Sequence, residues 1–196
     1  EYRRQRQMCI RDRCFCAQYT ILLLFAVCGA VPTDLCYNHS RIKTNQEMDI
    51  VTVDRQKVLD AFAAYIRPYD AQDPKVSLKI HHTYRVAALC EQIGRSIALE
   101  GTALDLAWLC GMLHDVGRFE QLRRFGTFDD SKSIDHARAG VQVLFEQGHI
   151  RDYLDDDSED AMLRTAVEWH SAYRLPDGLD ERTVMYCNIL RLSLIH

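Results

Sequence analysis

The sequence lacks the short motifs that mark several common classes of enzyme. It has no glycine-rich phosphate loop, no CxxC pair and no GxSxG motif, which argues against a P-loop nucleotide site, a CxxC metal or redox site and an α/β-hydrolase. The polar–apolar alternation typical of strands is almost absent, and there is no internal repeat. What is left is a mainly helical chain of 196 residues, enough for one domain with a proper core.

Positive charge and long apolar runs are also scarce. The 24 Lys and Arg residues are outnumbered by 28 Asp and Glu, for a net charge of −4, so the composition gives no support to binding of a nucleic-acid duplex. The apolar run at 21–31 is too short for a membrane helix, which needs about 20 residues. We therefore expect neither a duplex nor a membrane as a partner.

The first 47 residues differ from the rest in composition. A basic stretch precedes the 21–31 run, and Cys28 lies near a plausible cleavage site, so an exported protein with a signal peptide is one interpretation. We favour another, because QMCIRDR at 7–13 resembles translated sequencing-adapter DNA, as does LSLIH at 192–196. Met48 then stands where a natural start codon fits, directly before the first helical pattern.

This hypothesis divides the chain into three parts. Residues 1–47 are expected to be a non-native or disordered leader, residues 48–191 the native domain, and residues 192–196 a non-native tail of a domain cut short at its C-terminus. Three cysteines of the domain occupy apolar helical positions, where thiols act as small buried hydrophobes: Cys90, Cys110 and Cys187. The domain is therefore expected to be a reduced, cytoplasmic protein without disulfides.

From Met48 onward, apolar residues recur at helical spacing. The pattern predicts an all-α, compact bundle of about six helices. We place these helices at 54–66, 73–99, 102–115, 133–147, 155–172 and 179–196. Residues 117–132 are predicted to form a loop.

The predicted helices separate the histidines of the domain into inward and outward ones. His82 shares the apolar face of its helix, whereas His81 shares a polar face. His170 lies on the apolar stripe of its own helix. His136 lies one turn before Gly140, which leaves room for a close neighbour.

His114 and Asp115 form a doublet that follows a strongly apolar stretch and precedes Gly117. Adjacent helical residues point about 100° apart, so both converge on one ion only where the helix ends or packs against other ligand-bearing helices. Gly117 provides such an end. A buried aspartate beside a histidine is costly unless a cation compensates it.

A single inward histidine is more often a hydrogen-bonded core residue than a metal ligand, and His136 or His170 alone would be interpreted that way. His149, at a helix end, is expected on the surface. Four inward histidines and a buried aspartate favour a shared metal, because one cation satisfies all the imidazoles together. The predicted ligands are therefore His82, His114, Asp115, His136 and His170.

The order of these residues resembles the HD-domain superfamily of metal-dependent phosphohydrolases, and a bacterial subgroup of small HD proteins in particular. The similarity spans about 48–191. It is carried by KIHHTYRVA at 79–87 and GMLHDVGRFEQ at 111–121, and by RRFGTF at 123–128, SIDHARAG at 133–140, AVEWHSAYRLP at 166–176 and ERTVMYCNILR at 181–191. The resemblance implies a helical bundle in which His82, His114 and Asp115 hold one metal.

The resemblance also implies a second metal and reveals one departure. His136 and His170 match the extra histidines of family members that bind two ions. The family's closing aspartate is expected directly after ILR, where this chain has Leu192. One expected carboxylate ligand is therefore missing.

The chemistry of the ligands indicates which ions and which reaction to expect. Mixed imidazole and carboxylate ligands suit Mn, Fe, Co, Ni or Zn better than Mg. With one or two such ions, the chain is expected to hydrolyse a nucleotide or another small phosphate ester, with Asp115 able to bridge two ions. Arg118, just past the doublet, is placed to contact the phosphate; a surface salt bridge is an equally good interpretation.

Three other functions stay open at this point. A non-catalytic regulator that binds a nucleotide or metabolite fits the same bundle, and Leu192 makes it a better fit to this chain. A structural helical module predicts no metal. An exported protein requires residues 1–47 to be a genuine signal segment.

Overall fold

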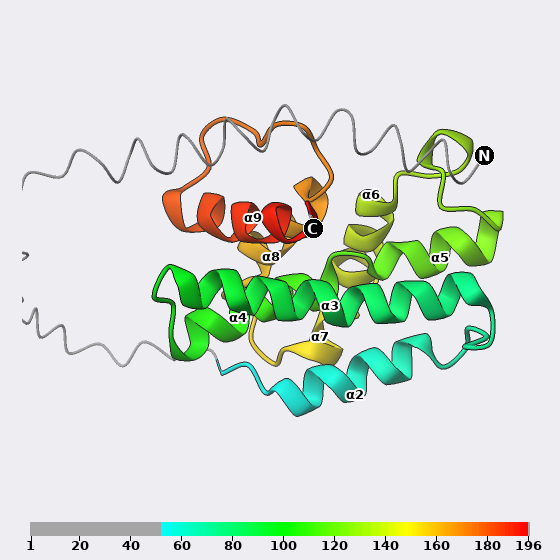
Figure 1. The fold of residues 1–196 in the computed structure, drawn as a ribbon, viewed down its shortest axis with the longest axis horizontal. Coiled ribbons are helices and arrows are strands. Elements are labelled where there is room, and N and C mark those ends of the chain that lie inside the picture. Colours follow the sequence, from blue (N-terminus) through cyan, green and yellow to red (C-terminus); the bar gives the residue numbers. More distant parts are fainter. Residues whose placement is uncertain (1–51, 196) are drawn as a thin grey trace, which may run out of the picture. The chain divides into compact units, whose positions relative to one another are not determined.

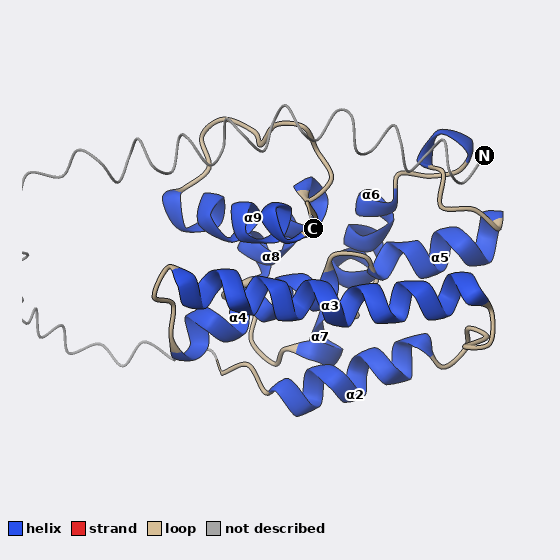
Figure 2. Cartoon of the chain, in the orientation of Figure 1, coloured by secondary structure: helices blue, strands red, loops and turns tan. Residues whose placement is uncertain are grey.

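A computed structural model describes residues 52–195, and every regular element within that range is helical (Figures 1 and 2). The predicted all-α fold is therefore confirmed, whereas the predicted leader at 1–47 lies outside the described residues. The α-helices are α2 (Arg55–Ile66), α3 (Pro74–Ser96), α4 (Gly101–Leu113), α5 (Val116–Phe125), α6 (His136–Val141), α7 (Ile150–Tyr153), α8 (Asp160–Trp169) and α9 (Glu181–Ser193). A 3-10 turn at Asp130–Lys132 and a π-helical turn at Gln142–Glu146 complete the set.

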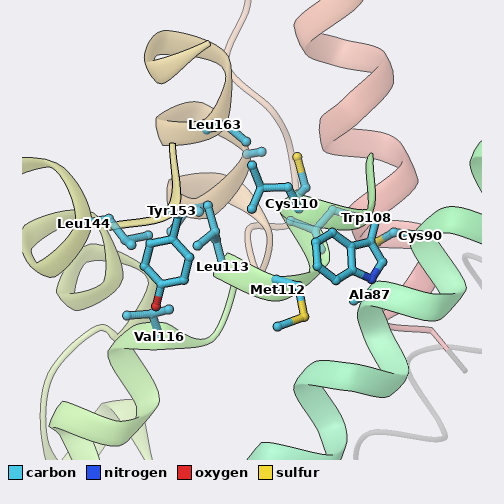
Figure 3. Close-up of a cluster of buried hydrophobic side chains, with 14 of the residues drawn as sticks. Ala87, Cys90, Trp108, Cys110, Met112, Leu113, Val116, Leu144, Tyr153 and Leu163 are labelled. Atoms are coloured by element: carbon cyan, nitrogen blue, oxygen red, sulfur yellow. The ribbon is translucent and has the colours of Figure 1, made fainter. Parts of the chain in front are cut away.

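The core is built around α4, whose sequence is apolar on all sides. Such a helix is stable only when other helices surround it, and α4 contacts α2, α3, α8 and α9. Figure 3 shows Trp108, Cys110 and Met112 of α4 beside side chains of α3 and α8. The C-terminal end of α4 is thus buried. The two polar residues that follow Leu113, His114 and Asp115, therefore also lie in the protein interior.

The longest helix, α3, runs past α4 and α9 (Figure 1). Its start follows from sequence, because the Asp73 side chain accepts a hydrogen bond from the Lys75 amide and Pro74 occupies the first turn. On the α4 side it buries Val86, Ala87 and Cys90. These contacts fix the side of α3 that faces the core.

The predicted loop at 117–132 is wrong over its first half, where the structure has α5. Val116, Phe119 and Leu122 recur at a spacing of three and are buried, so one face of this arginine-rich segment packs into the core. The helix ends at Gly126, whose φ of 65° is left-handed and whose amide bonds to the Leu122 carbonyl. The short helix α7 was also not predicted.

The last helix does not end where the predicted tail begins. α9 continues through Leu192 to Ser193, which is buried and accepts a hydrogen bond from the Cys90 thiol at 3.4 Å. The proposal that residues 192–196 are non-native stays a prediction, and His196 lies outside the described residues. The thiols of Cys90, Cys110 and Cys187 are free and buried.

Within residues 52–195, none of the helices is both long enough and apolar enough to cross a membrane.

Candidate metal centre

The structure brings all five predicted ligands together at a junction of five helices. His82 lies on α3, His114 directly follows α4, and Asp115 directly precedes α5. His136 is the first residue of α6, and His170 directly follows α8. The side chains of His114, Asp115, His136 and His170 are almost fully buried, and that of His82 is 34% exposed. Residues spread over almost ninety positions of the sequence thus share one interior site.

Two glycines allow the helices to approach closely enough for these contacts. A Cβ atom added to Gly111 of α4 would lie 2.5 Å from the Ala87 Cα of α3, which leaves no space for any other residue. A Cβ added to Gly117 of α5 would lie 2.2 Å from the His136 carbonyl oxygen. Gly117 therefore does not end a helix, as predicted from sequence; it lies within α5 and lets α6 pack against it.

The bend in the chain falls on the doublet itself. α4 ends before His114, and Asp115 has φ −107° and ψ 16°, close to the sparsely populated bridge region, before α5 begins. This change of direction turns two adjacent side chains toward the same interior point. The prediction that the doublet lies at a helix end is confirmed. The helix ends at Leu113, however, and Gly117 is not the cause of that end.

His82 and His114 form the first of two histidine pairs, which we call the outer pair. Their Nε2 atoms are 3.2 Å apart. The His114 Nδ1 donates to the Gly111 carbonyl oxygen at 2.7 Å, so its Nε2 carries a lone pair when the ring is neutral. Both Nε2 atoms face Asp115 Oδ2, at 3.5 Å from His82 and 3.4 Å from His114.

His136 and His170 form the second pair, the inner pair, with Nε2 atoms 3.0 Å apart. The His170 Nδ1 donates to the Val167 carbonyl oxygen at 2.7 Å, and the His136 Nδ1 faces the Asp130 carboxylate at 2.5 Å. Both Nδ1 atoms therefore carry the proton, and both Nε2 atoms present lone pairs to each other. Each Nε2 is also 3.8 Å from Asp115 Oδ1.

Burial keeps His82, His136 and His170 neutral at physiological pH. Burial, together with the neighbouring His114, lowers the pKa of His170 to about 3 and the pKa of His82 to about 4. Burial likewise lowers the pKa of His136. Burial alone would raise the pKa of Asp115, but His114 and the Lys79 ammonium more than offset this and hold it well below its ordinary value.

These protonation states make the inner pair a poor hydrogen bond and a good cation site. Two lone pairs at 3.0 Å repel each other unless a cation lies between them. Two ligands that each lie at about 2.1 Å from one ion are roughly 3.0–3.4 Å apart, which matches both histidine pairs. Among residues 52–195, three groups of three donors could hold a metal. Two of them include Asp115, one with each histidine pair, and the third joins His136 with Asp130 and Asp135.

Two charged residues that were not predicted from the sequence belong to the same site. Lys79 Nζ lies 2.8 Å from Asp115 Oδ2, and Asp130 binds the Nδ1 of His136. Lys79 precedes His82 by three residues, so helical spacing places it on the same face and was a usable signal. Asp130 comes from an irregular segment, where no periodicity points to it.

Arg118 is linked to the inner pair through Asp130, and its side chain is 15% exposed. Its Nη1 donates to the Gln121 side chain, to the Phe128 carbonyl oxygen and to Asp130 Oδ1 at 2.6 Å. Its Nε is 3.7 Å from Asp115 Oδ1 and has no hydrogen-bond partner. The predicted ion pair therefore exists, but it is an interior one that borders the candidate ligands.

The histidines predicted to lie outside the centre do so. His81 is exposed and bonds to the Ser77 carbonyl oxygen, and His149 pairs with Asp152 at the surface. Leu192 is half-buried in the last turn of α9 and has no donor atom to offer a metal.

The segment that carries the candidate ligands matches a known protein family. The sequence model described as HD domain matches residues 80–187, which is more than half of the 196-residue chain. No curated protein and no solved structure matches the chain. The match includes all five candidate ligands, from His82 to His170, and stops before Leu192.

Proposed function

This chain belongs to the HD-domain superfamily of metal-dependent phosphohydrolases, and from that premise we propose that it hydrolyses a nucleotide or another small phosphate ester with the help of a divalent transition metal. The inner pair carries this proposal. Its two Nε2 lone pairs meet at 3.0 Å beside a buried carboxylate, and in that arrangement a cation is the missing partner.

The ligand set suits one or two ions of Mn, Fe, Co, Ni or Zn. His82, His114 and Asp115 Oδ2 offer one group of three ligands, and His136, His170 and Asp115 Oδ1 offer the other. Bound there, such an ion would lower the pKa of a water molecule and offset charge on the phosphoryl oxygens. Three protein ligands leave coordination positions for water and substrate, so the lack of a carboxylate at Leu192 does not remove the site.

The remaining residues of the centre position these ligands. Asp130 holds the His136 ring so that its Nε2 points inward, as carboxylates do behind metal-binding histidines. Arg118 in turn fixes Asp130 through Nη1. We propose that the Nε of Arg118, which lacks a partner beside Asp115, also contacts the phosphoryl group of the substrate.

Hydrolysis of a phosphate ester is the direct test. The purified protein, stripped with chelator and reloaded with each first-row ion, is assayed on nucleoside monophosphates, dNTPs, cyclic dinucleotides and an aryl phosphate. We expect hydrolysis of at least one class, abolished by chelator and restored by metal. Products are also separated by chromatography, because opening one bond of a cyclic dinucleotide yields a linear dinucleotide and no free phosphate. If metal binds but none of the substrates is hydrolysed, the chain is not a phosphohydrolase.

The alternative is a regulator that binds a nucleotide or metabolite without hydrolysing it, and Leu192 is the observation that favours it. A regulator would retain an added nucleotide intact together with its metal. If so, Leu192→Asp is expected to confer slow hydrolysis, because the resemblance places a carboxylate ligand there. The products bound to wild type and variant, separated by chromatography, distinguish the two functions.

We further propose that the protein acts in the bacterial cytoplasm on a small phosphorylated substrate. The three buried free thiols support a reducing compartment, and burial raises the pKa of Cys90 to about 11, which keeps it inert.

A further inference from the structure

Lys79 is an unusual neighbour for a metal centre. Its ammonium bonds to Asp115 Oδ2 at 2.8 Å, on the same oxygen that faces the outer pair, and its side chain is only 17% exposed. We propose that Lys79 is a catalytic residue that binds a phosphoryl oxygen of the substrate. This inference rests on the proposed function and adds to it a residue outside the metal ligands.

The charges of the site support this role. Asp130 is paired with Arg118, whereas Asp115 Oδ2 faces both Lys79 and the outer pair. A divalent ion at the outer pair would share Asp115 with a second cation, and the two positive charges would repel each other. An ammonium in that position weakens metal binding unless an anion completes the site. A phosphate ester supplies that anion.

The Lys79 ammonium has N–H groups available to bind a phosphate ester. An ammonium has three N–H groups, and Asp115 is the single hydrogen-bond acceptor that Nζ has among residues 52–195. One side of Nζ is covered by the Phe128 ring, whose centroid is 5.3 Å away. The free donors can therefore reach an anion while the bond to Asp115 stays in place.

Lys79 also lies where substrate can enter. It is one turn before His82 on α3, and His82 is 34% exposed while the other three histidines of the two pairs are at most 4% exposed. A phosphoryl group that approaches the outer pair from solvent therefore meets the side of the centre that carries Lys79.

Two titrations of the same protein test the proposal, the first with Mn²⁺ and the second with inorganic phosphate after Mn²⁺ loading. The variant is Lys79→Gln, whose amide can still donate to Asp115. We expect its affinity for Mn²⁺ to stay equal or rise severalfold, and its affinity for phosphate to fall about 10- to 100-fold. Lys79→Arg, which keeps the charge, is expected to recover part of the phosphate affinity.

Lys132→Gln is the matched control, because it removes one positive charge from a side chain that is 71% exposed. It should change neither affinity by more than about twofold. If Lys79→Gln binds phosphate as tightly as wild type, or loses Mn²⁺ and phosphate together, Lys79 has only a structural role and the inference fails while the proposed function stands. If wild type binds no Mn²⁺, the proposed function fails and the inference with it.

Discussion

The outer and inner histidine pairs contact the same carboxylate, yet they are held in different ways. In the inner pair, Val167 and Asp130 fix both Nδ1 protons, so neither Nε2 can donate to the other. In the outer pair only His114 is fixed in this way, and His82 has a ring free to donate through Nε2 and a side chain open to solvent. The inner pair could therefore accept a cation without rearrangement, whereas the two imidazoles of the outer pair can hydrogen-bond to each other without one.

Because of this difference, the two pairs suit different roles. A rigid, buried pair with both lone pairs aligned binds an ion with little reorganisation. A pair with one partly exposed ring adjusts more easily and stays accessible to water and substrate. We therefore infer that the inner pair binds its ion more tightly and that the outer pair, with Lys79, receives the phosphoryl group.

Asp115→Asn should have the largest effect on metal content and turnover, because it impairs both histidine pairs at once. Asp115 is the carboxylate that both pairs share, and an amide in its place is a weaker metal ligand without charge. We expect loss of metal at both pairs and a fall in phosphate release of at least about 1000-fold, since electrostatic stabilisation is the largest part of such catalysis. Metal content and turnover are measured together, with the exposed Asp152→Asn as control. An unchanged metal content would contradict the shared role of Asp115.

His170→Gln and His82→Gln should separate the two pairs. His170→Gln is expected to remove the tightly bound ion, and His82→Gln to weaken the other ion while the inner one is retained, because two-metal sites bind each ion through its own ligands. Calorimetric titration with Mn²⁺ distinguishes the tight phase from the weak one. His81→Gln, on the exposed face of α3, should alter neither phase. Equal losses in the two site variants would mean a single joint site.

Asp130→Asn should affect the inner pair alone. The change weakens the contact that orients the His136 ring, and such supporting carboxylates are worth about 10- to 100-fold in metal affinity or activity. We expect a loss of that size in the tight phase of the Mn²⁺ titration and little change in the weak phase. Asp177→Asn, which breaks an exposed ion pair with Arg174, serves as the control. A loss confined to the weak phase would reverse the assignment of the two pairs.

The smallest effect expected is on the pH dependence of stability without metal. The folded-state pKa of His170 is about 3 and that of His82 is about 4, both below the unfolded value of about 6.5. The unfolded chain therefore binds more protons below pH 6.5, and stability falls as the pH drops from there toward 4. We expect the Tm in chelator to fall by about 5 °C or more over that range.

The same melts on His170→Gln should show a shallower fall, because one neutral buried imidazole has been removed. Asp115, whose pKa is lowered, adds its own loss only below the unfolded value of about 3.8. A Tm that is flat between pH 6.5 and 4.5 in wild type would contradict the burial of neutral imidazoles.

The sequence was sufficient for the parts of the centre that depend on helical faces. His82 could be found because its helix has one apolar stripe, and the doublet because an apolar segment placed it in the interior. The pairing of Lys79 with Asp115 could not be predicted, since it joins residues 36 positions apart through the packing of α3 against the α4–α5 junction. Helical spacing could have placed Lys79 on the face of His82, but it could not have identified Asp115 as its partner.

The error at α5 has a similar cause. A glycine two residues after a buried aspartate is typical of a helix end, and three arginines within ten residues favour a solvated loop. In the structure the backbone of α6 packs directly against Gly117, and α5 forms because Val116, Phe119 and Leu122 share a buried face. Tertiary contact, which a single sequence does not reveal, decides both features.

Anomalous X-ray diffraction from crystals of the Mn²⁺-loaded protein would show whether the two histidine pairs bind metal. We expect one manganese peak bonded to the Nε2 atoms of His136 and His170 and a weaker one at His82 and His114, with Asp115 between them. An absence of manganese at both pairs, with the inner nitrogens still 3.0 Å apart, would contradict this expectation.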